Sequence, residues 1–558
     1  MNALPRHRFV DQFSSSIWVL ISGVMLGLSF PPFPFWWLAY VALVPLLVRW
    51  SRLPLGWMLL REAYSTFLIM AAIAGHWVLF HEQVLTALTS GLGLLLLPVP
   101  MTLPVVAAGL AKRRFGFNAG FVVLVTFWLA MEFALMHGPV AMPWLLLGNT
   151  QAAATPFNQF ADLTGVGGLT LWVWLVNGFI FWTLESRVVL ARVGLAAVVI
   201  ALVAAPVGYG WWRVDNLETS TASLEVGIVQ PAVSPRSWSD VTNGARVDLM
   251  ASLSVQQLQE SERGARRPGL LVWPETSLPV YADARRQRAL YNRLSRWTLQ
   301  HNVALLTGAI TRYDSAPSLT VDAVDAEKFA QVTPYYNSAL LFQGHGRTQQ
   351  IDKIHMVPFA ERVPLVEWRP ALAALGVASG GVGAYGLGRR IRTMEAGPTQ
   401  FGTLICYESI FGDHARQLAK KGAEFLAVLS QDGWWGQSAG YRQHFELSRL
   451  RAVETRRAVV LGAVTGQSGL IGPDGGVHES TGWMEQTVQQ VSVPLLHEQT
   501  YYTLHGDWLG RAALVLALLL TVTWGFVTLF FPRWRVPSER TKRAQPPRKV
   551  FGFRRSPS

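Results

Sequence analysis

Residues 168–210 read GLTLWVWLVNGFIFWTLESRVVLARVGLAAVVIALVAAPVGYG, two apolar stretches joined by a short polar segment around Arg187 and Arg192. The stretches 168–184 and 188–210 are each about long enough to cross a hydrocarbon core of ~30 Å as a helix. The whole chain agrees with a membrane location, because 51% of its 558 residues are hydrophobic and only 15% are charged. Soluble domains usually carry about 25% charged residues.

Six further apolar stretches of similar length lie along the chain, at residues 14–30, 34–50, 60–80, 88–111, 119–137 and 511–531. We therefore expect a polytopic α-helical membrane bundle of about eight spans. The chain is predicted to contain a seven-span membrane domain over 1–210, an eighth span within 506–531 and a basic, disordered tail over 532–558. The first stretch has no small-residue cleavage site, so it is predicted to be a retained helix and not a signal peptide.

Lys and Arg occur at alternate ends of these stretches. They lie near the amino terminus, after the second, fourth and sixth spans, and in the tail, whereas the turns 31–34, 81–86 and 138–167 contain neither. Because cytoplasmic loops are enriched in Lys and Arg, both termini are predicted to be cytoplasmic. Residues 211–505 then lie on the opposite, extracytoplasmic side of the membrane. The net charge of +13 is explained by the membrane surface, and no nucleic-acid partner is expected.

The composition changes between residues 211 and 505, where charges of both signs appear and β-rich runs alternate with polar helical stretches. Strands are predicted over 224–233, 269–273, 303–310, 338–342, 403–406, 425–430 and 459–464. Helices are predicted over 242–263, 282–301 and 441–457. Strands that alternate with helices indicate an α/β layer fold, so this segment is expected to form one extracytoplasmic catalytic domain.

Three motifs of this domain carry residues suited to covalent catalysis: LLVWPETSLP with Glu275, IDKIHMVPFAERVPL with Lys353 and Glu361, and GTLICYESIFGD with Cys406, Tyr407 and Glu408. A thiol is a weak nucleophile until it is deprotonated. Glu275 can take that proton as a general base, and the Lys353 ammonium can lower the thiol pKa and stabilise an oxyanion. We therefore predict acyl transfer through a thioester on Cys406.

These motifs resemble the Glu-Lys-Cys triad of the nitrilase superfamily. Outside the triad, FPPFPFWWLA, MPWLLLGNTQ, FADLTGVGGLTLWVWLVN, GIVQPAV and TLHGDW resemble the apolipoprotein N-acyltransferase family, over almost the whole chain up to the tail. The resemblance implies a bacterial inner membrane with a nitrilase-type αββα sandwich on its periplasmic side. It also implies transfer of a fatty acyl chain from a phospholipid, phosphatidylethanolamine in particular, to the N-terminal amine of a diacylglyceryl-cysteine lipoprotein, by a monomer.

The same resemblance implies supporting roles outside the triad, for Glu361, Tyr407, Glu408, Trp238 and Trp434. Glu361 would position the charges of the triad, and the two tryptophans would contact substrate or shape the mouth of the site. Plain aromatic packing is an equal alternative for both tryptophans. No cofactor or metal is expected, and the chain's single cysteine excludes a zinc or iron–sulfur site built on several thiolates.

Other readings stay open at this point. A membrane-tethered amidase would use the same triad, with water resolving the acyl-enzyme. A transporter is disfavoured because the spans lack paired ionisable residues and repeated halves. The histidines His355, His414 and His444 could indicate a Cys-His enzyme, but Glu275 already supplies a base. The apolar, Gly-rich residues 365–388 fit either a lid or an ordinary surface loop.

The chain departs from the family pattern at two places in the catalytic domain. In the segment 430–435, SQDGWW, Gln431 stands where the family usually has Asn, and AVTGQSG over 463–469 replaces a usual A-T-N-x-G stretch. These changes leave the triad intact and concern the acceptor site. In the fifth span, Glu132 is a candidate for a contact within the helix bundle or along a substrate channel.

Overall fold

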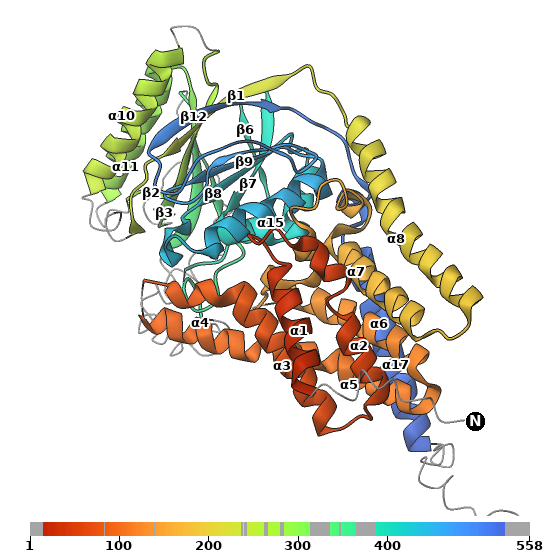
Figure 1. Cartoon of the computed structure of the whole chain (residues 1–558). Helices are drawn as coiled ribbons and strands as arrows, with labels where there is room; N and C mark the ends of the chain where they lie inside the picture. Colours follow the sequence, from red (N-terminus) through yellow and green to blue (C-terminus); the bar gives the residue numbers. More distant parts are fainter. Residues whose placement is uncertain are drawn as a thin grey trace, which may run out of the picture.

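The structure is a computed structural model that describes residues 15–82, 84–138, 140–235, 238, 243–261, 266–279, 284–312, 335–344, 348–363 and 385–530. It consists of a helical bundle with a two-sheet sandwich seated on one end of it (Figure 1). The predicted tail over 532–558 and all but the last four residues of the predicted lid over 365–388 lie outside the described residues.

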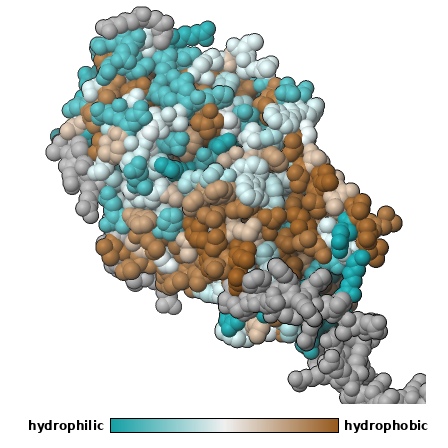
Figure 2. Space-filling view, in the orientation of Figure 1, coloured by the Kyte–Doolittle hydropathy of each residue, from teal (hydrophilic) through white to brown (hydrophobic). Residues whose placement is uncertain are grey.

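The bundle contains the helices α1 (Ser15–Leu28), α2 (Val44–Arg52), α3 (Trp57–Gly75), α4 (Val84–Leu96), α5 (Pro98–Phe115), α6 (Phe117–Leu135), α7 (Ala161–Glu185), α8 (Val189–Asp215) and α17 (Trp508–Phe530). Six helical segments of the described chain are long and apolar enough to cross a membrane. No residue in the most apolar window of α8 is buried, which fits a helix in contact with lipid. On the face shown in Figure 2, apolar residues gather over the bundle, and polar residues are more frequent over the sandwich.

About eight spans were expected, and six candidate spans are found among the described residues, because two of the apolar stretches form shorter helices. Only Ile17–Leu28 of the first is an apolar helix, and residues 34–50 break into a 3-10 turn, η1 (Trp36–Tyr40), and the nine-residue α2. Asn177 of α7 compensates for the break: its amide oxygen accepts from the Leu43 N–H (2.9 Å) and its nitrogen donates to the Ala39 carbonyl (2.7 Å). Irregular backbone at this depth is tolerated where protein groups satisfy it.

The sandwich contains two six-stranded sheets, with the strand orders β12-β1-β2-β3-β4-β5 and β11-β10-β9-β8-β7-β6. The first sheet contains β1 (Ser223–Gln230), β2 (Leu270–Leu278), β3 (Ala304–Thr311), β4 (Tyr336–Phe342), β5 (Thr348–Asp352) and β12 (Thr487–Pro494). The second contains β6 (Thr393–Ala396), β7 (Thr399–Ile405), β8 (Leu426–Ser430), β9 (Val459–Ala463), β10 (Gly469–Ile471) and β11 (Val477–Ser480). The central strands of each sheet are parallel, and every predicted strand has a counterpart.

Apolar side chains hold the sandwich together in three layers. Val272 and Leu306 of the first sheet meet Phe401 and Phe425 of the second, all fully buried. Helices α10 (Asn243–Ser261) and α11 (Ala284–Gln300) cover the outer face of the first sheet (Figure 1), and α14 (Gly412–Lys420) and α15 (Ala439–Thr455) cover that of the second. The predicted αββα arrangement is therefore confirmed.

Helix α15 lies between the second sheet and the bundle (Figure 1), and Gln443 fastens it there. The Gln443 amide oxygen accepts from the indole N–H groups of Trp77 (2.8 Å) and Trp144 (2.7 Å). Its amide nitrogen donates to the carbonyls of Pro31 (2.6 Å) and Ala74 (2.8 Å). All four hydrogen-bonding positions of this buried amide are thus filled by the bundle, so the joint between the two parts has a fixed geometry.

Glu132 of α6 has a role inside the bundle. Its carboxylate accepts hydrogen bonds from the Trp128 indole (3.0 Å), the Leu147 N–H (2.7 Å) and the Thr170 hydroxyl (2.6 Å). These bonds tie α6 to α7 and to the segment between them. Of the two predicted possibilities for Glu132, the structure therefore favours the contact within the bundle.

Candidate active site

Glu275 is pushed out of its strand by a local irregularity of β2. The pairing of β2 with β3 shifts register between Trp273 and Leu278, and Thr276 has a left-handed φ of 54°. Gly308 of β3 makes room for this, because a Cβ there would lie 2.5 Å from the Glu275 Cα. The Glu275 side chain, 6% exposed, therefore points away from the ladder into the space between the strand ends.

Lys353 follows β5 directly, and its fully buried ammonium lies between two carboxylates. Its Nζ is 3.2 Å from Glu275 Oε1 and 2.8 Å from Glu361 Oε1. Asn337 of β4 donates from Nδ2 to the same two oxygens, at 2.8 and 3.0 Å. Two of the three ammonium N–H groups are thus engaged by described acceptors, which leaves the third for a reacting group.

The charges of this cluster depend on one another. Burial lowers the pKa of the Lys353 ammonium, but the Glu275 and Glu361 carboxylates outweigh burial and hold that pKa well above its ordinary value. Burial raises the pKa of Glu275, and the Lys353 ammonium partly offsets it. A carboxylate whose pKa is raised is a stronger base than a free one, which suits the role predicted for Glu275.

Cys406 begins a 3-10 turn, η8 (Cys406–Ile410), at the end of β7. Its backbone is left-handed, with φ of 50°, a conformation that costs roughly 1–2 kcal/mol for a residue with a side chain. The Glu408 carboxylate braces the turn: one oxygen accepts from the Ile405 N–H (2.9 Å) and the other from the Ile354 N–H, next to Lys353 (2.6 Å). Glu408 therefore joins the nucleophile turn to the loop of the lysine.

The thiol of Cys406 is buried at the meeting point of these charges. Burial raises its pKa well above the ordinary value, the Glu275 carboxylate raises it further, and the Lys353 ammonium lowers it. The effect of Lys353 has the predicted direction, but burial is larger, so the resting group is a protonated thiol that needs a base. The fold brings Glu275, Lys353 and Cys406 together from the ends of three strands in two sheets.

Tyr407 and Trp434 both face the helical bundle. The Tyr407 hydroxyl donates to the Ala141 carbonyl (3.1 Å), and its ring stacks near Trp144, with centroids 6.2 Å apart. Trp434, in the turn η9 (Asp432–Trp435), lies parallel to the His81 ring at 5.9 Å. These two aromatic residues therefore line the seam between sandwich and bundle.

Trp238 is 4% exposed and packs in the core between the first sheet and its covering helices. The Arg246 guanidinium lies 4.9 Å from its ring centroid and donates to the Thr276 carbonyl (2.9 Å), the residue after Glu275. Trp238 is thus linked to the Glu275 segment through Arg246. A direct contact with substrate stays a prediction.

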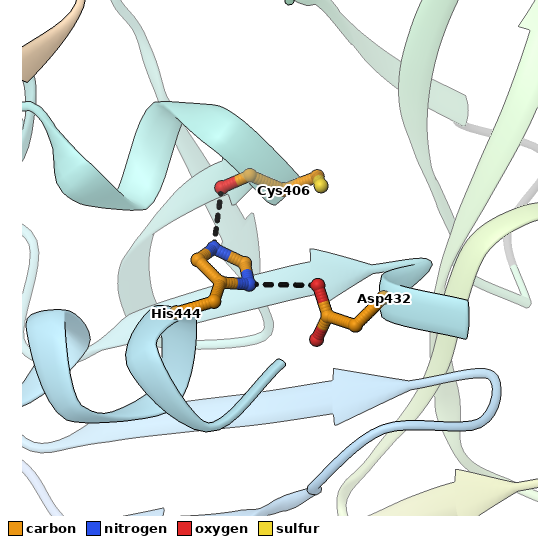
Figure 3. A group of neighbouring side chains, drawn as sticks. All are labelled: Cys406, Asp432 and His444. Carbon is orange, nitrogen blue, oxygen red and sulfur yellow. Dashed lines mark hydrogen bonds and ion pairs between the residues drawn. The ribbon is translucent and has the colours of Figure 1, made fainter. Parts of the chain in front are cut away.

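The structure also brings a histidine to the nucleophile, which the sequence pattern did not single out (Figure 3). Cys406, Asp432 and His444 place one potential ligand atom each within 4.8 Å of the others, all of them buried. His444 Nδ1 lies 2.8 Å from Asp432 Oδ1, and Nε2 lies 3.0 Å from the Cys406 carbonyl oxygen. Nε2 also lies 2.6 Å from the Ser409 hydroxyl. Both ring nitrogens are therefore engaged by polar groups of the described chain, and this arrangement suits hydrogen bonding better than a metal.

Comparisons with known proteins cover both parts of the chain. The family model for the carbon-nitrogen hydrolases matches residues 226–501, and that for the apolipoprotein N-acyltransferase N-terminal domain matches residues 22–179. An apolipoprotein N-acyltransferase of Chlorobaculum tepidum is 31% identical over 90% of this chain and 95% of its own length. One of Geobacter metallireducens is 28% identical over 93% and 96%.

Among solved structures, an amidase from Nesterenkonia sp. is similar at 18% identity, covering 52% of this chain and 98% of its own, with a TM-score of 0.36. The relatives, in contrast, match from the first helices of the bundle to the end of the sandwich at comparable total length. On the strength of this full-length similarity, together with the two family models, the chain belongs to the apolipoprotein N-acyltransferase family.

Proposed function

We propose that this protein transfers a fatty acyl chain from a phospholipid, through a thioester on Cys406, to the N-terminal amine of a diacylglyceryl-cysteine lipoprotein. One observation carries the proposal: a buried Glu275–Lys353–Cys406 cluster lies in a chain whose bundle and sandwich both match the family. Phosphatidylethanolamine is the proposed donor, and a monomer is the proposed working unit.

In the first half-reaction, Glu275 takes the proton of the Cys406 thiol, and Sγ attacks the ester carbonyl carbon of the phospholipid. The carbonyl oxygen becomes an oxyanion, which the free N–H of the Lys353 ammonium stabilises. The C–O bond then breaks, the lysophospholipid leaves with the proton held by Glu275, and the acyl chain remains on sulfur. Glu361 keeps Lys353 charged and in place through its 2.8 Å contact.

In the second half-reaction, the lipoprotein amine attacks the thioester carbonyl. Glu275 accepts the proton that the amine loses, the C–S bond breaks, and the proton returns to the Cys406 sulfur. The product is an amide, and the enzyme is restored. Burial of the cluster disfavours attack by water, because a closed site excludes solvent from the thioester.

The test is to incubate purified protein with phosphatidylethanolamine and to measure the mass of the intact protein by mass spectrometry. A mass increase of one acyl group that Cys406→Ala abolishes supports the thioester, and a diacylated lipopeptide added next should leave as the triacylated product. Free fatty acid with no acylated peptide would instead support the amidase-like alternative. The same assay with other head groups tests the choice of donor, and mass photometry in detergent tests the monomer.

We further propose that the sandwich lies on the periplasmic side of the inner membrane, with both termini cytoplasmic. Basic residues support this orientation. Arg49 and Arg52 end α2 and Lys112 to Arg114 end α5, whereas the bundle groups that bond Gln443 of the sandwich lie at the opposite ends of their segments. The Arg52–Glu185 pair (3.1 Å) joins α2 to the end of α7 at this basic side.

Site-directed labelling tests the orientation. In a Cys406→Ala background, His478→Cys on the exposed β11 should react with a membrane-impermeant maleimide in intact spheroplasts. The matched variant Arg113→Cys, exposed at the other end of the bundle, should react only after permeabilisation. The reverse pattern would place the sandwich in the cytoplasm and exclude the proposed topology.

A further inference from the structure

The hydrogen bonds of His444 favour a ring that is protonated on both nitrogens. Nε2 faces the Cys406 carbonyl oxygen at 3.0 Å and the Ser409 hydroxyl at 2.6 Å. A carbonyl can only accept, so the bond to Cys406 requires a hydrogen on Nε2, which the Ser409 hydroxyl then also accepts. Nδ1 faces Asp432 Oδ1 at 2.8 Å, and the Ser430 hydroxyl already donates to that oxygen at 2.6 Å. In this arrangement Nδ1 carries a hydrogen as well, and His444 is an imidazolium paired with Asp432.

The electrostatics of the pocket agree with this geometry. Burial lowers the pKa of the His444 imidazolium, but the charge of Asp432 and its hydrogen bond raise it more, and the net shift is upward. The hydrogen bond to the Cys406 carbonyl acts in the same direction. The raised pKa favours the doubly protonated ring, which can donate from both nitrogens, whereas neutral imidazole donates from only one.

His444 holds the carbonyl of Cys406, a residue whose backbone is strained. Cys406 has φ of 50°, and such a conformation persists only where its surroundings hold it. Glu408 fixes the peptide N–H before Cys406, through Ile405, and His444 fixes the carbonyl after its Cα. The two bonds clamp the residue from both sides, and Figure 3 shows the sulfur directed away from the carbonyl that His444 holds.

We propose that His444 is a positioning residue for the nucleophile: its Nε2–H holds the Cys406 carbonyl, and this keeps the sulfur facing Glu275 and Lys353. His444 has no bond to the reacting atoms and acts through the backbone of Cys406. The helix that carries it cannot shift easily, because the neighbouring Gln443 is bonded four times to the bundle. The inference rests on the proposed thioester chemistry of Cys406.

Two amide substitutions separate the bonds of His444. The Nε2 amide of His444→Gln takes the place of the imidazole Nε2 and can still donate to the Cys406 carbonyl. The shorter amide of His444→Asn takes the place of Nδ1, so it keeps the bond to Asp432 and loses the one to Cys406. A role in holding the nucleophile predicts activity in the Gln variant, whereas a role in merely pairing with Asp432 predicts activity in the Asn variant.

The measurement is the single-turnover rate of thioester formation with phosphatidylethanolamine in full-length protein. We expect His444→Asn to lower this rate by about 10²-fold, the cost of a misplaced reacting group, with KM for phospholipid unchanged. His444→Gln should stay within about tenfold of wild type by the same reasoning. Glu446→Gln, which breaks a partly buried ion pair with Arg449 on the same helix, is the control and should match wild type.

Equal loss in the Gln and Asn variants, or better activity in Asn, would overturn the proposal. Ser409→Ala provides a milder test, because the Ser409 hydroxyl shares Nε2 with the carbonyl at 2.6 Å. It should keep the wild-type rate, and a loss as large as that of the Asn variant would contradict us. Alkylation of Cys406 by iodoacetamide needs no acyl donor, and its rate should fall in the His444→Asn variant only. This measurement tests the positioning role of His444 separately from thioester formation.

Discussion

Replacing Lys353 by Met removes one positive charge from a buried cluster and leaves a side chain of similar length. The change leaves the buried Glu275 carboxylate and the partly buried Glu361 carboxylate without their cation, and the Asn337 amide is then their shared donor. Breaking a buried ion pair on one side typically costs about 3–5 kcal/mol. At ~2–4 °C per kcal/mol for a domain of this size, a loss of about 3 kcal/mol lowers the unfolding midpoint by roughly 6–12 °C.

The chain's own chemistry provides the assay. Cys406 is its single cysteine and is 7% exposed, so a fluorogenic maleimide reports the loss of structure at the site itself as the temperature rises in detergent. In the same samples, kcat of Lys353→Met should fall about 10²–10³-fold, as when one oxyanion donor is lost. Lys353→Arg keeps a charge and serves as the control for stability.

A second substitution sharpens the test. Glu361→Gln alone weakens the bond to Lys353, so it should lower the midpoint of the wild type. In the Lys353→Met background it removes one of two repelling carboxylates, so it should raise the midpoint by several degrees. If Glu361→Gln had the same sign in both backgrounds, the carboxylates would not be coupled through Lys353 as described.

The pH dependence of Lys353→Met follows from the same charges. Burial already raises the pKa of Glu275, and loss of the ammonium that lowers it raises it further. A carboxyl group whose folded pKa lies above its unfolded value favours the folded state at low pH, and this advantage disappears as pH rises through the folded value. The unfolding midpoint of Lys353→Met should therefore lie closer to that of wild type at pH 5 than at pH 8. An equal difference at both pH values would contradict the raised pKa of Glu275.

Three further outcomes are expected. Cys406→Ala and Cys406→Ser should abolish turnover and thioester formation while the protein stays membrane-inserted, and substantial acyl transfer by either would disprove the covalent scheme. Glu408→Gln, which weakens a buried acceptor of three backbone N–H groups, should lower kcat at least tenfold and stability by about 1.5–3 kcal/mol, both measurable in the assays above. Gln443→Ala should lower the unfolding midpoint reported by the maleimide, because four bonds to the bundle are lost, whereas Glu446→Gln on the same helix should not.

The strand-rich half of the fold was predictable because its signals are local. Val272 and Phe425 lie in short apolar runs bounded by polar turns, and such runs are typical of buried strands in a layered fold. The interruption of the helix within the second apolar stretch was not predictable, for a physical reason. Hydropathy records that residues 34–50 are apolar, but it does not record that Asn177, far along the chain, satisfies a broken backbone there.

In the candidate site too, features with a local sequence signal were predictable and those that depend on distant contacts were not. Glu275, Lys353 and Cys406 each follow an apolar run, so their positions at strand ends could be predicted one by one. The place of His444 could not, because it depends on the pitch of α15 and on a contact across 38 residues with a backbone carbonyl, which carries no side-chain signature. Glu408, by contrast, was named from family resemblance, and the structure supplies its reason.

The amide of Gln443 also bears on how the molecule is made. Trp77, Trp144, Pro31 and Ala74 precede it by 299 to 412 residues, so a ribosome finishes those segments long before it reaches their partner. Until then two indole N–H groups and two carbonyls at the rim of the helices have only water or lipid head groups to bond. The helices are therefore inserted before their hydrogen-bonding partner exists. The sandwich, which is made later, must dock onto these donors and acceptors.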